Sequence, residues 1–331
     1  MGYTQVDTPP EPRFVMNGPR TEKRRLYPSG HSWLTARVLM AALVCVAGTL
    51  TAAGLGARGT DEDGQVVKWG RLGVLNNQWG AALGHADAAS YQHVRVEDDS
   101  RVVFEFDWRN KTPADAAWVK AFPSIVAGWH YGVPVYPGDA TLLNLPVQLL
   151  KKPKLATRLR ALRSGGTTSD VMNLAWDIWL TSSMPDPAAT NPVAPAAEIM
   201  VWPWRQNQGP LTLEGSSTRA CSRASKEPTT AAPIARNISV WNTKWDLYFG
   251  CASDGHTVWP ALSFVAQSPL ASDAGDVVAT GNLGDFAAYA SANASRWTTW
   301  NRAWWIAGVE LGSEIIQGSG SWTIAEYRIE P

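Results

Sequence analysis

From Val66 to the end of the chain, apolar and polar residues alternate in short runs separated by Gly, Pro, Asn and Asp. The alternation is clearest over residues 101–108, 171–179, 238–245 and 322–329. Successive side chains of a strand point to opposite faces, so this pattern predicts strands with one buried face. Many short strands with turns between them are typical of a sandwich or barrel. Only residues 283–294 indicate a helix, so we expect an all-β fold with one packed helix.

The N-terminal part of the chain has a different pattern. Residues 1–37 are polar and rich in Pro and Arg, which predicts a disordered tail because little there could form a core. Residues 38–55 contain no charge and just reach the length that spans a bilayer. Basic residues precede this run and acidic residues follow it at 61–63, which places the N-terminus in the cytoplasm. We therefore predict a type II membrane anchor over 38–57, with the remaining domain extracellular or luminal.

A cleavable signal peptide is the alternative interpretation of this apolar run. Such peptides have a shorter basic region than the 37 residues found here, but small residues near Ala53 and Ala57 leave cleavage open. Cleavage would make the protein secreted. In either case we assign residues 58–65 to a linker and residues 66–331 to the folded domain.

Composition adds one strong feature, a count of 18 Trp against 7 Phe and 8 Tyr. At least half of these indoles are expected in a sandwich core, but flat rings with a polar N–H also stack on sugars. The 29 basic and 29 acidic residues cancel, which argues against a nucleic-acid partner. The exported part has two cysteines, Cys221 and Cys251, and the sequence leaves open whether they form a disulfide.

Several kinds of catalytic site are absent from the sequence after the apolar run. It has no phosphate-binding glycine loop, no HExxH, no paired CxxC and no GxSxG motif. Its histidines, His85, His93, His130 and His256, lack the spacing of metal ligands. We therefore expect neither a metal site nor a cofactor.

Three carboxylates lie in unusually apolar surroundings. Glu198 lies within residues 196–202, Glu314 within residues 308–318, and Asp177 between two tryptophans. A buried ionised carboxylate is unfavourable unless it has a partner, although strand alternation could place each one on a wet face. Together they fit glycoside hydrolysis, which needs one carboxylic acid to protonate the leaving oxygen and a second carboxylate opposite. A third carboxylate could share a proton with the second.

Six segments in order carry a resemblance to a known family. They are Asn76-Asn-Gln-Trp-Gly80, Val119-Lys-Ala-Phe-Pro123, Asn173-Leu-Ala-Trp-Asp-Ile-Trp179, Glu198-Ile-Met-Val-Trp202, Ser263-Phe-Val-Ala266 and Gly312-Ser-Glu-Ile-Ile-Gln-Gly318. Through them the chain from about Val66 onward resembles glycoside hydrolase family 12, which comprises small endoglucanases and xyloglucan-specific endoglucanases. Each motif is weak alone, and their common order makes the resemblance specific. It implies a jelly-roll sandwich of two curved antiparallel sheets with a concave substrate cleft.

The resemblance also implies roles for individual residues. Glu198 matches the nucleophile, Glu314 the general acid/base and Asp177 the partner of the nucleophile. Trp79 matches a platform on which a glucosyl unit stacks, and Asn77 and Trp202 match other positions of the cleft. Met200, two residues from Glu198 on the same strand face, is expected to line the site.

These roles predict a retaining endo-β-1,4-glucanase that acts on β-glucan or xyloglucan by double displacement. They also predict a higher pKa for Glu314 than for Glu198 in the free enzyme. The alternative is a non-catalytic carbohydrate-binding protein with the same cleft, or more remotely a lectin-like recognition factor. A binding module has no need of all three carboxylates, which favours the enzyme.

Two departures from the family pattern bear on the substrate and the site. Ala197 stands where a Tyr commonly precedes the nucleophile. Residues 151–163 are basic where the family usually has aromatic side chains. A solvated sheet face would explain the basic stretch. If Arg158 and Arg160 instead face the groove, the substrate would be other than a neutral glucan.

Overall fold

The computed structural model describes residues 58–97, 100–135, 144–190, 193–212, 221, 232–253, 257–272 and 274–331. The expected tail and the expected anchor over 38–57 lie outside these residues. Within the described part of the chain, no helix is both long enough and apolar enough to cross a bilayer.

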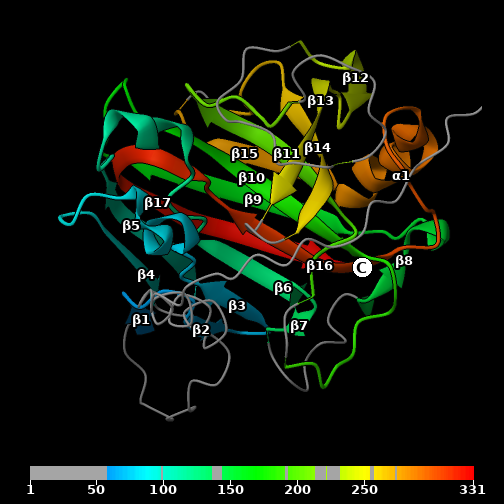
Figure 1. The fold of residues 1–331 in the computed structure, drawn as a ribbon, viewed down its shortest axis with the longest axis horizontal. Coiled ribbons are helices and arrows are strands. Elements are labelled where there is room, and N and C mark those ends of the chain that lie inside the picture. The colour runs from blue at the N-terminus through cyan, green and yellow to red at the C-terminus, as the bar shows by residue number, and fades with distance from the viewer. Residues whose placement is uncertain are drawn as a thin grey trace, which may run out of the picture.

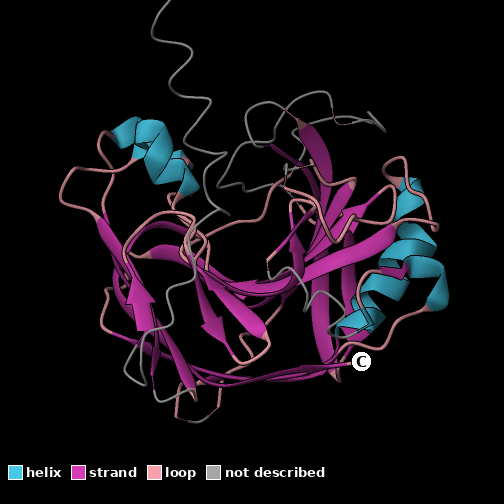
Figure 2. Ribbon diagram, turned by 90° about the horizontal axis from the view of Figure 1, so that it is seen from below, coloured by secondary structure: helices cyan, strands magenta, loops and turns pink. Residues whose placement is uncertain are grey.

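The described chain forms two curved sheets that stack on one another (Figure 1, Figure 2). Sheet A contains, in spatial order, β1 (Arg58–Thr60), β4 (Tyr91–Glu97), β5 (Arg101–Trp108), β17 (Ile315–Glu330), β9 (Ala156–Ser164) and β15 (Val277–Asn282). Sheet B contains β2 (Val66–Trp69), β3 (Leu72–Leu75), β6 (Ser124–His130), β16 (Trp305–Gly312), β10 (Val171–Thr181), β11 (Ala197–Gln206), β14 (Val258–Ala266), β13 (Thr243–Ser253) and β12 (Ala235–Val240). Short β7 (Val133–Pro134) and β8 (Val147–Gln148) pair with β6 and β16. The jelly-roll expectation is confirmed, with one difference: β11 and β14 are parallel.

Strand β17 belongs to both sheets. Its first residues pair with β10 in sheet B, and residues from Gly318 onward pair with β5 and β9 in sheet A. Gly318 has φ 143°, a conformation that residues with a Cβ rarely adopt, so a larger residue would strain this crossing. The crossing begins directly after Glu314, which places that carboxylate where the two sheets join.

The core lies between the sheets, and helix α1 (Leu283–Asn293) closes one end of it (Figure 1). This helix agrees with the sequence-based prediction. The side chain of Asn282 caps it by accepting a hydrogen bond from the N–H of Gly284 at 3.0 Å. Phe286 on its buried face contacts the rings of Trp241 and Trp245, each at 4.9 Å between centroids.

Two local predictions were wrong. Residues 238–245 were expected to form one strand, but they form the hairpin between β12 and β13 with its turn at Trp241 and Asn242. Both turn residues have positive φ, 54° and 57°, and the alternating pattern continues through the turn without a Gly to mark it. Residues 58–65 were expected as a linker, but Arg58–Thr60 pairs with β4. A strand of three residues is too short to show a period.

The second half of the basic stretch 151–163 forms β9 of sheet A. Arg158 and Arg160 are 63% and 54% exposed and pair with Glu326 at 3.2 Å and Asp276 at 2.8 Å. The solvated-face interpretation is confirmed for these two arginines, whereas Arg163 is 15% exposed and pairs with Asp170. None of the three candidate carboxylates lies on β9, because they belong to sheet B and its junction with β17.

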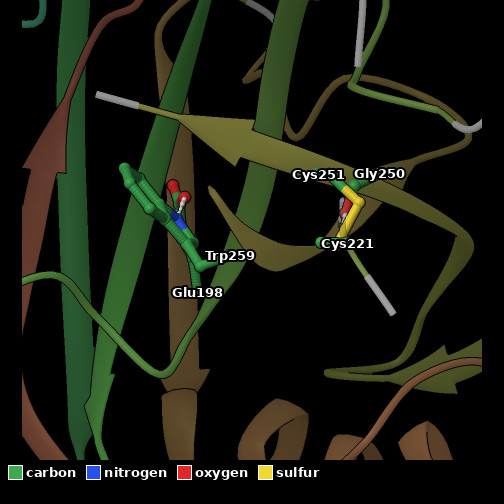
Figure 3. The surroundings of a disulfide bond; sticks show 5 residues. All are labelled: Glu198, Cys221, Gly250, Cys251 and Trp259. Atoms are coloured by element: carbon green, nitrogen blue, oxygen red, sulfur yellow. Dashed lines mark hydrogen bonds between the residues drawn. A yellow bond between two sulfur atoms is a disulfide. The ribbon is translucent and has the colours of Figure 1, made fainter. Parts of the chain in front are cut away.

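Cys221 and Cys251 form a disulfide with their Cα atoms 5.6 Å apart (Figure 3). Cys251 lies in β13, two strands away from β11. The bond therefore fixes Cys221 next to sheet B.

Candidate active site

Strand β10 lies at the centre of the site, between β11 and β16, and both of its faces are covered. Met172, Leu174, Trp176, Ile178 and Leu180 point into the core between the sheets. The intervening residues of β10, including Asp177, point to the opposite face of sheet B, which we call the site face. Nearly the whole strand is buried, so a carboxylate on either face is taken out of bulk water.

Glu198 reaches the site face from β11. It lies opposite Trp179 in the register of β10 and β11 and is 5% exposed. The indole Nε1 of Trp259 donates a hydrogen bond to its Oε2 at 2.9 Å (Figure 3). Burial raises the pKa of Glu198 to about 8, although the Trp259 hydrogen bond acts in the opposite direction.

Asp177 lies between Met200 of β11 and Glu310 of β16 in the strand register. It is 3% exposed, and its Oδ1 has no hydrogen-bond partner among the described residues. Burial, followed by the neighbouring Glu198, Glu314 and Glu310, raises the pKa of Asp177 well above its usual range. Asp177 therefore holds a proton under conditions where an exposed aspartate would not.

Glu314 follows β16 and is held by β10 through Asn173. The Asn173 side chain accepts a hydrogen bond from the Glu314 N–H at 2.9 Å and donates one to Oε2 at 2.5 Å. Gln208 Nε2 donates a second bond to Oε2 at 3.1 Å. Burial raises the pKa of Glu314 to about 7, and the Asn173 and Gln208 hydrogen bonds limit the rise.

Burial raises the pKa of both glutamates, and neutral donors act against it at each. Glu314 accepts two side-chain hydrogen bonds and Glu198 accepts one. Nearby Glu314 and Glu310 also raise the pKa of Glu198. The higher pKa expected for Glu314 in the free enzyme stays a prediction.

The other predicted site residues lie in two places. Met200 and Trp202 form a small apolar cluster with Ala175 and Val265 on the site face, next to Tyr248. Trp202 Nε1 is buried without a hydrogen-bond partner among the described residues. The segment with Asn77 and Trp79 is half-buried and lies beside residues 120–122, which in turn pair with Ile315, the residue after Glu314. Links through Phe122, whose N–H donates to the Asn77 carbonyl, and through Lys120 hold it there.

Sequence reasoning missed a fourth carboxylate, Glu310, which is fully buried beside Asp177. It accepts hydrogen bonds from Ser124 Oγ at 2.9 Å and Trp179 Nε1 at 2.6 Å, and its Oε1 lies 2.5 Å from His130 Nδ1. A signal was present, because Glu310 is a lone charge within the apolar run 306–311. Its partners on β6 and β10 are distant in sequence and could not be assigned from spacing.

Three aromatic rings that the sequence did not single out surround the region of Glu198. Tyr131 lies 5.1 Å from Trp179 and 5.8 Å from Trp259, measured between ring centroids. Trp179 and Trp259 are 6.4 Å apart. The two indoles each donate their N–H to a carboxylate, Trp179 to Glu310 and Trp259 to Glu198. Glu310 and Glu198 are therefore linked through these two hydrogen bonds and the contact between the two indoles.

This arrangement has the parts that acid-assisted nucleophilic displacement requires. It combines buried carboxylates that hold protons near neutral pH with neutral hydrogen-bond donors and aromatic rings. Among the described residues, neither Lys nor Arg forms an ion pair with Asp177, Glu198 or Glu314. The protonation of these groups is therefore set by burial, by neutral hydrogen-bond donors and by one another.

Known proteins share sequence and fold with this chain. Endoglucanase S of Pectobacterium parmentieri is 24% identical over 259 residues, which cover 78% of this chain and 80% of that protein. A family 12 xyloglucanase from Bacillus licheniformis has a similar fold, with a TM-score of 0.63 at 22% identity, over 82% of this chain and 99% of that one. Endoglucanase Cel12A from Rhodothermus marinus gives 0.54 at 18% identity, over 82% and 95%.

The sequence model that describes glycosyl hydrolase family 12 matches residues 70–330. This range contains both sheets except β1 and β2, and it includes all four buried carboxylates. With this match over most of its length, the chain belongs to glycosyl hydrolase family 12.

Proposed function

We propose that this glycoside hydrolase cleaves internal β-1,4-glucosidic bonds of a glucan or xyloglucan with Glu198 as nucleophile and Glu314 as acid/base. Enzymes of this family retain the configuration of the anomeric carbon. The observation that carries the assignment is that both glutamates are removed from water on one face of sheet B. Burial there raises the pKa of each carboxyl towards neutral. The pair can then hold one proton between them at neutral pH.

In the first step, the Glu198 carboxylate attacks the anomeric carbon while Glu314 gives its proton to the glycosidic oxygen. The bond between carbon and leaving oxygen breaks, and a covalent glycosyl-enzyme forms. In the second step, the Glu314 carboxylate removes a proton from water, whose oxygen attacks the same carbon and releases Glu198. Asn173 and Gln208 hold Glu314 throughout both steps.

Asp177 is proposed as the partner of Glu198. The two come from neighbouring strands on one face, and burial favours the protonated form of Asp177. A protonated Asp177 can donate to the Glu198 carboxylate and stabilise its ionised form, and Trp259 supports the same form with its hydrogen bond. This is how Glu198 becomes ionised although burial alone opposes it.

We propose a neutral β-glucan as substrate, with Trp79 and Asn77 contacting sugar units and the buried Met200 and Trp202 supporting the floor of the cleft beneath them. The relatives are described as a xyloglucanase and as endoglucanases, which leaves the preferred polymer to be measured. The exposed arginines of β9 lie on sheet A and are paired with acids there, so they favour no acidic polymer at the site face.

The deciding experiment measures release of reducing ends by residues 58–331 from xyloglucan, mixed-linkage β-glucan, carboxymethyl cellulose and an acidic polysaccharide. Glu198→Gln is run beside the wild type, and Glu326→Gln, a paired surface glutamate of sheet A, is the matched control. We expect Glu198→Gln to remove activity and Glu326→Gln to keep it. Binding to one polymer without hydrolysis of any would support the alternative function, a carbohydrate-binding protein. Full activity in Glu198→Gln would refute the nucleophile.

We further propose that residues 38–57 anchor the protein in a membrane with the catalytic domain outside the cytoplasm. The support is the uncharged run 38–55 between basic and acidic flanks. Full-length protein should stay with membranes after extraction at alkaline pH, and the domain should be cut by protease added to intact cells. Release of a shortened chain into the medium would instead establish a cleaved signal peptide.

A further inference from the structure

We propose that Glu310 is a positioning residue, a fourth carboxylate that orients Trp179 and His130 and places a fixed negative charge beside Asp177. The inference rests on the proposed roles of Asp177 and Glu198 and adds a residue to which none has been assigned. Glu310 is fully buried, so its position and charge need a specific explanation.

The contacts of Glu310 fix its position. Trp179 Nε1 donates to Oε1 and Ser124 Oγ donates to Oε2, and His130 Nδ1 lies 2.5 Å from Oε1. Both carboxylate oxygens are therefore engaged. The three partners come from β6 and β10, the strands on either side of β16, so they fix Glu310 from both neighbours.

The position of Glu310 connects it to the proposed catalytic groups. It lies directly opposite Asp177 in the register of β10 and β16, and such pairs have their Cβ atoms about 4.5–5.5 Å apart. Trp179, which Glu310 holds, lies opposite Glu198 in the register of β10 and β11. Glu310 therefore affects Asp177 directly through its charge. It affects Glu198 indirectly, because it orients the Trp179 indole that lies opposite Glu198.

His130 is the exposed end of this group. Its side chain is 25% exposed, whereas that of Glu310 is fully buried. Edge-to-face contacts with Tyr131 at 4.7 Å and Trp179 at 6.1 Å hold the imidazole among the aromatic rings of the site. Glu310 thus fixes the orientation of a polar ring that solvent can reach on the site face.

The titratable groups around Glu310 determine which pH effects its charge can have. They are His130 of β6, Asp177 of β10, Glu198 of β11, Glu314 after β16 and Tyr327 of β17. The charge of Glu310 raises the pKa of Asp177, Glu198 and Tyr327, and burial contributes more than this charge in all three. Removal of the charge should therefore lower the pKa of Asp177 and Glu198.

Two substitutions separate charge from position. Glu310→Gln keeps the length of the side chain and removes the charge, whereas Glu310→Asp keeps the charge and shortens the reach to Trp179 and His130. Glu326→Gln is the matched control, because it removes a carboxylate of sheet A that is ion-paired with Arg158. The measurement is the pH profile of kcat/KM, with kcat and KM separately, on the polymer preferred by the wild type.

We expect the acid limb of the Glu310→Gln profile to move to lower pH by about one unit, because Glu198 then ionises more readily. For Glu310→Asp, the acid limb of the pH profile should stay at the wild-type position. Its kcat should fall at least about tenfold, because the shorter side chain no longer positions Trp179 and His130. A wild-type profile and rate in Glu310→Gln would overturn the proposal. If that variant does not fold, a wild-type rate in Glu310→Asp would overturn it. Failure of the proposed function would appear separately, as full activity in Glu198→Gln.

Discussion

Charged side chains on the two sheets are stabilised in different ways. On the outer face of sheet A, Arg158 and Arg160 are exposed and each pairs with an acid of a neighbouring strand. On the site face of sheet B, Asp177, Glu198 and Glu310 are buried, and their described partners are indole, hydroxyl and imidazole groups or one another. Exposed ion pairs contribute little because water screens them, whereas buried carboxylates change protonation instead.

This difference shows that the number of charges in a strand says little about function. Strand β9 has three arginines and carries no part of the proposed chemistry, while β10 has a single carboxylate at the centre of it. Burial makes the charge of Asp177 unfavourable and therefore dependent on its neighbours. The following predictions test this contrast, starting with the largest expected effect.

After replacement of the proposed nucleophile, replacement of the proposed acid should have the largest effect on rate. For Glu314→Gln we expect kcat on polymer to fall about 10²–10⁴-fold, because no group then protonates the leaving oxygen. An aryl glucoside whose leaving group needs no protonation should lose much less in its first step. Steady-state and burst kinetics on both substrates measure this. Equal losses on the two substrates would contradict the acid role.

Replacement of Asp177 should have an intermediate effect. Asp177→Asn retains the shape but has no carboxyl proton to share with Glu198, so we expect roughly a tenfold to hundredfold loss in kcat/KM, or about 1.4–2.7 kcal/mol. The matched control is Asp276→Asn, which removes a buried carboxylate that pairs with Arg160 beside sheet A, away from the site face. Similar losses in the two variants would remove the distinction between the sheets.

Removal of the buried charge at Glu198 should stabilise the fold at alkaline pH. Burial raises the folded-state pKa from 4.5 to about 8, so stability from this group is present below pH 4.5 and is lost as pH rises towards 8. Glu198→Gln should therefore be more stable than the wild type by on the order of 2 kcal/mol at pH 9. The difference should shrink towards pH 5. Denaturant unfolding at both pH values measures it, and an equal difference at each would contradict the burial argument.

Replacement of the paired arginines of sheet A should have the smallest effect. Each of Arg158→Gln and Arg160→Gln removes the exposed arginine of one ion pair, so we expect at most about 1 kcal/mol in unfolding free energy. The hydrolysis rate should stay within about twofold of the wild type, since that corresponds to only about 0.4 kcal/mol. A large change in kcat/KM would show that sheet A takes part in substrate binding.

The sequence determined the fold class, the helix over 283–294 and the strands over 101–108 and 171–179, because period and burial are local properties of a strand or helix. It also supplied Asp177, Glu198 and Glu314 as candidates, since each is a charge within an apolar run. The turn at Trp241 and Asn242 was missed because alternation continued through it.

Only the tertiary structure decided how these carboxylates are stabilised. Glu310, Ser124 and His130 are brought together by the pairing of β16 with β6, which no sequence spacing encodes. The Trp259 bond to Glu198 likewise depends on the parallel pairing of β11 with β14. A charge in an apolar run is visible in the sequence, but its protonation depends on neighbours from distant strands, and only folding sets their distances.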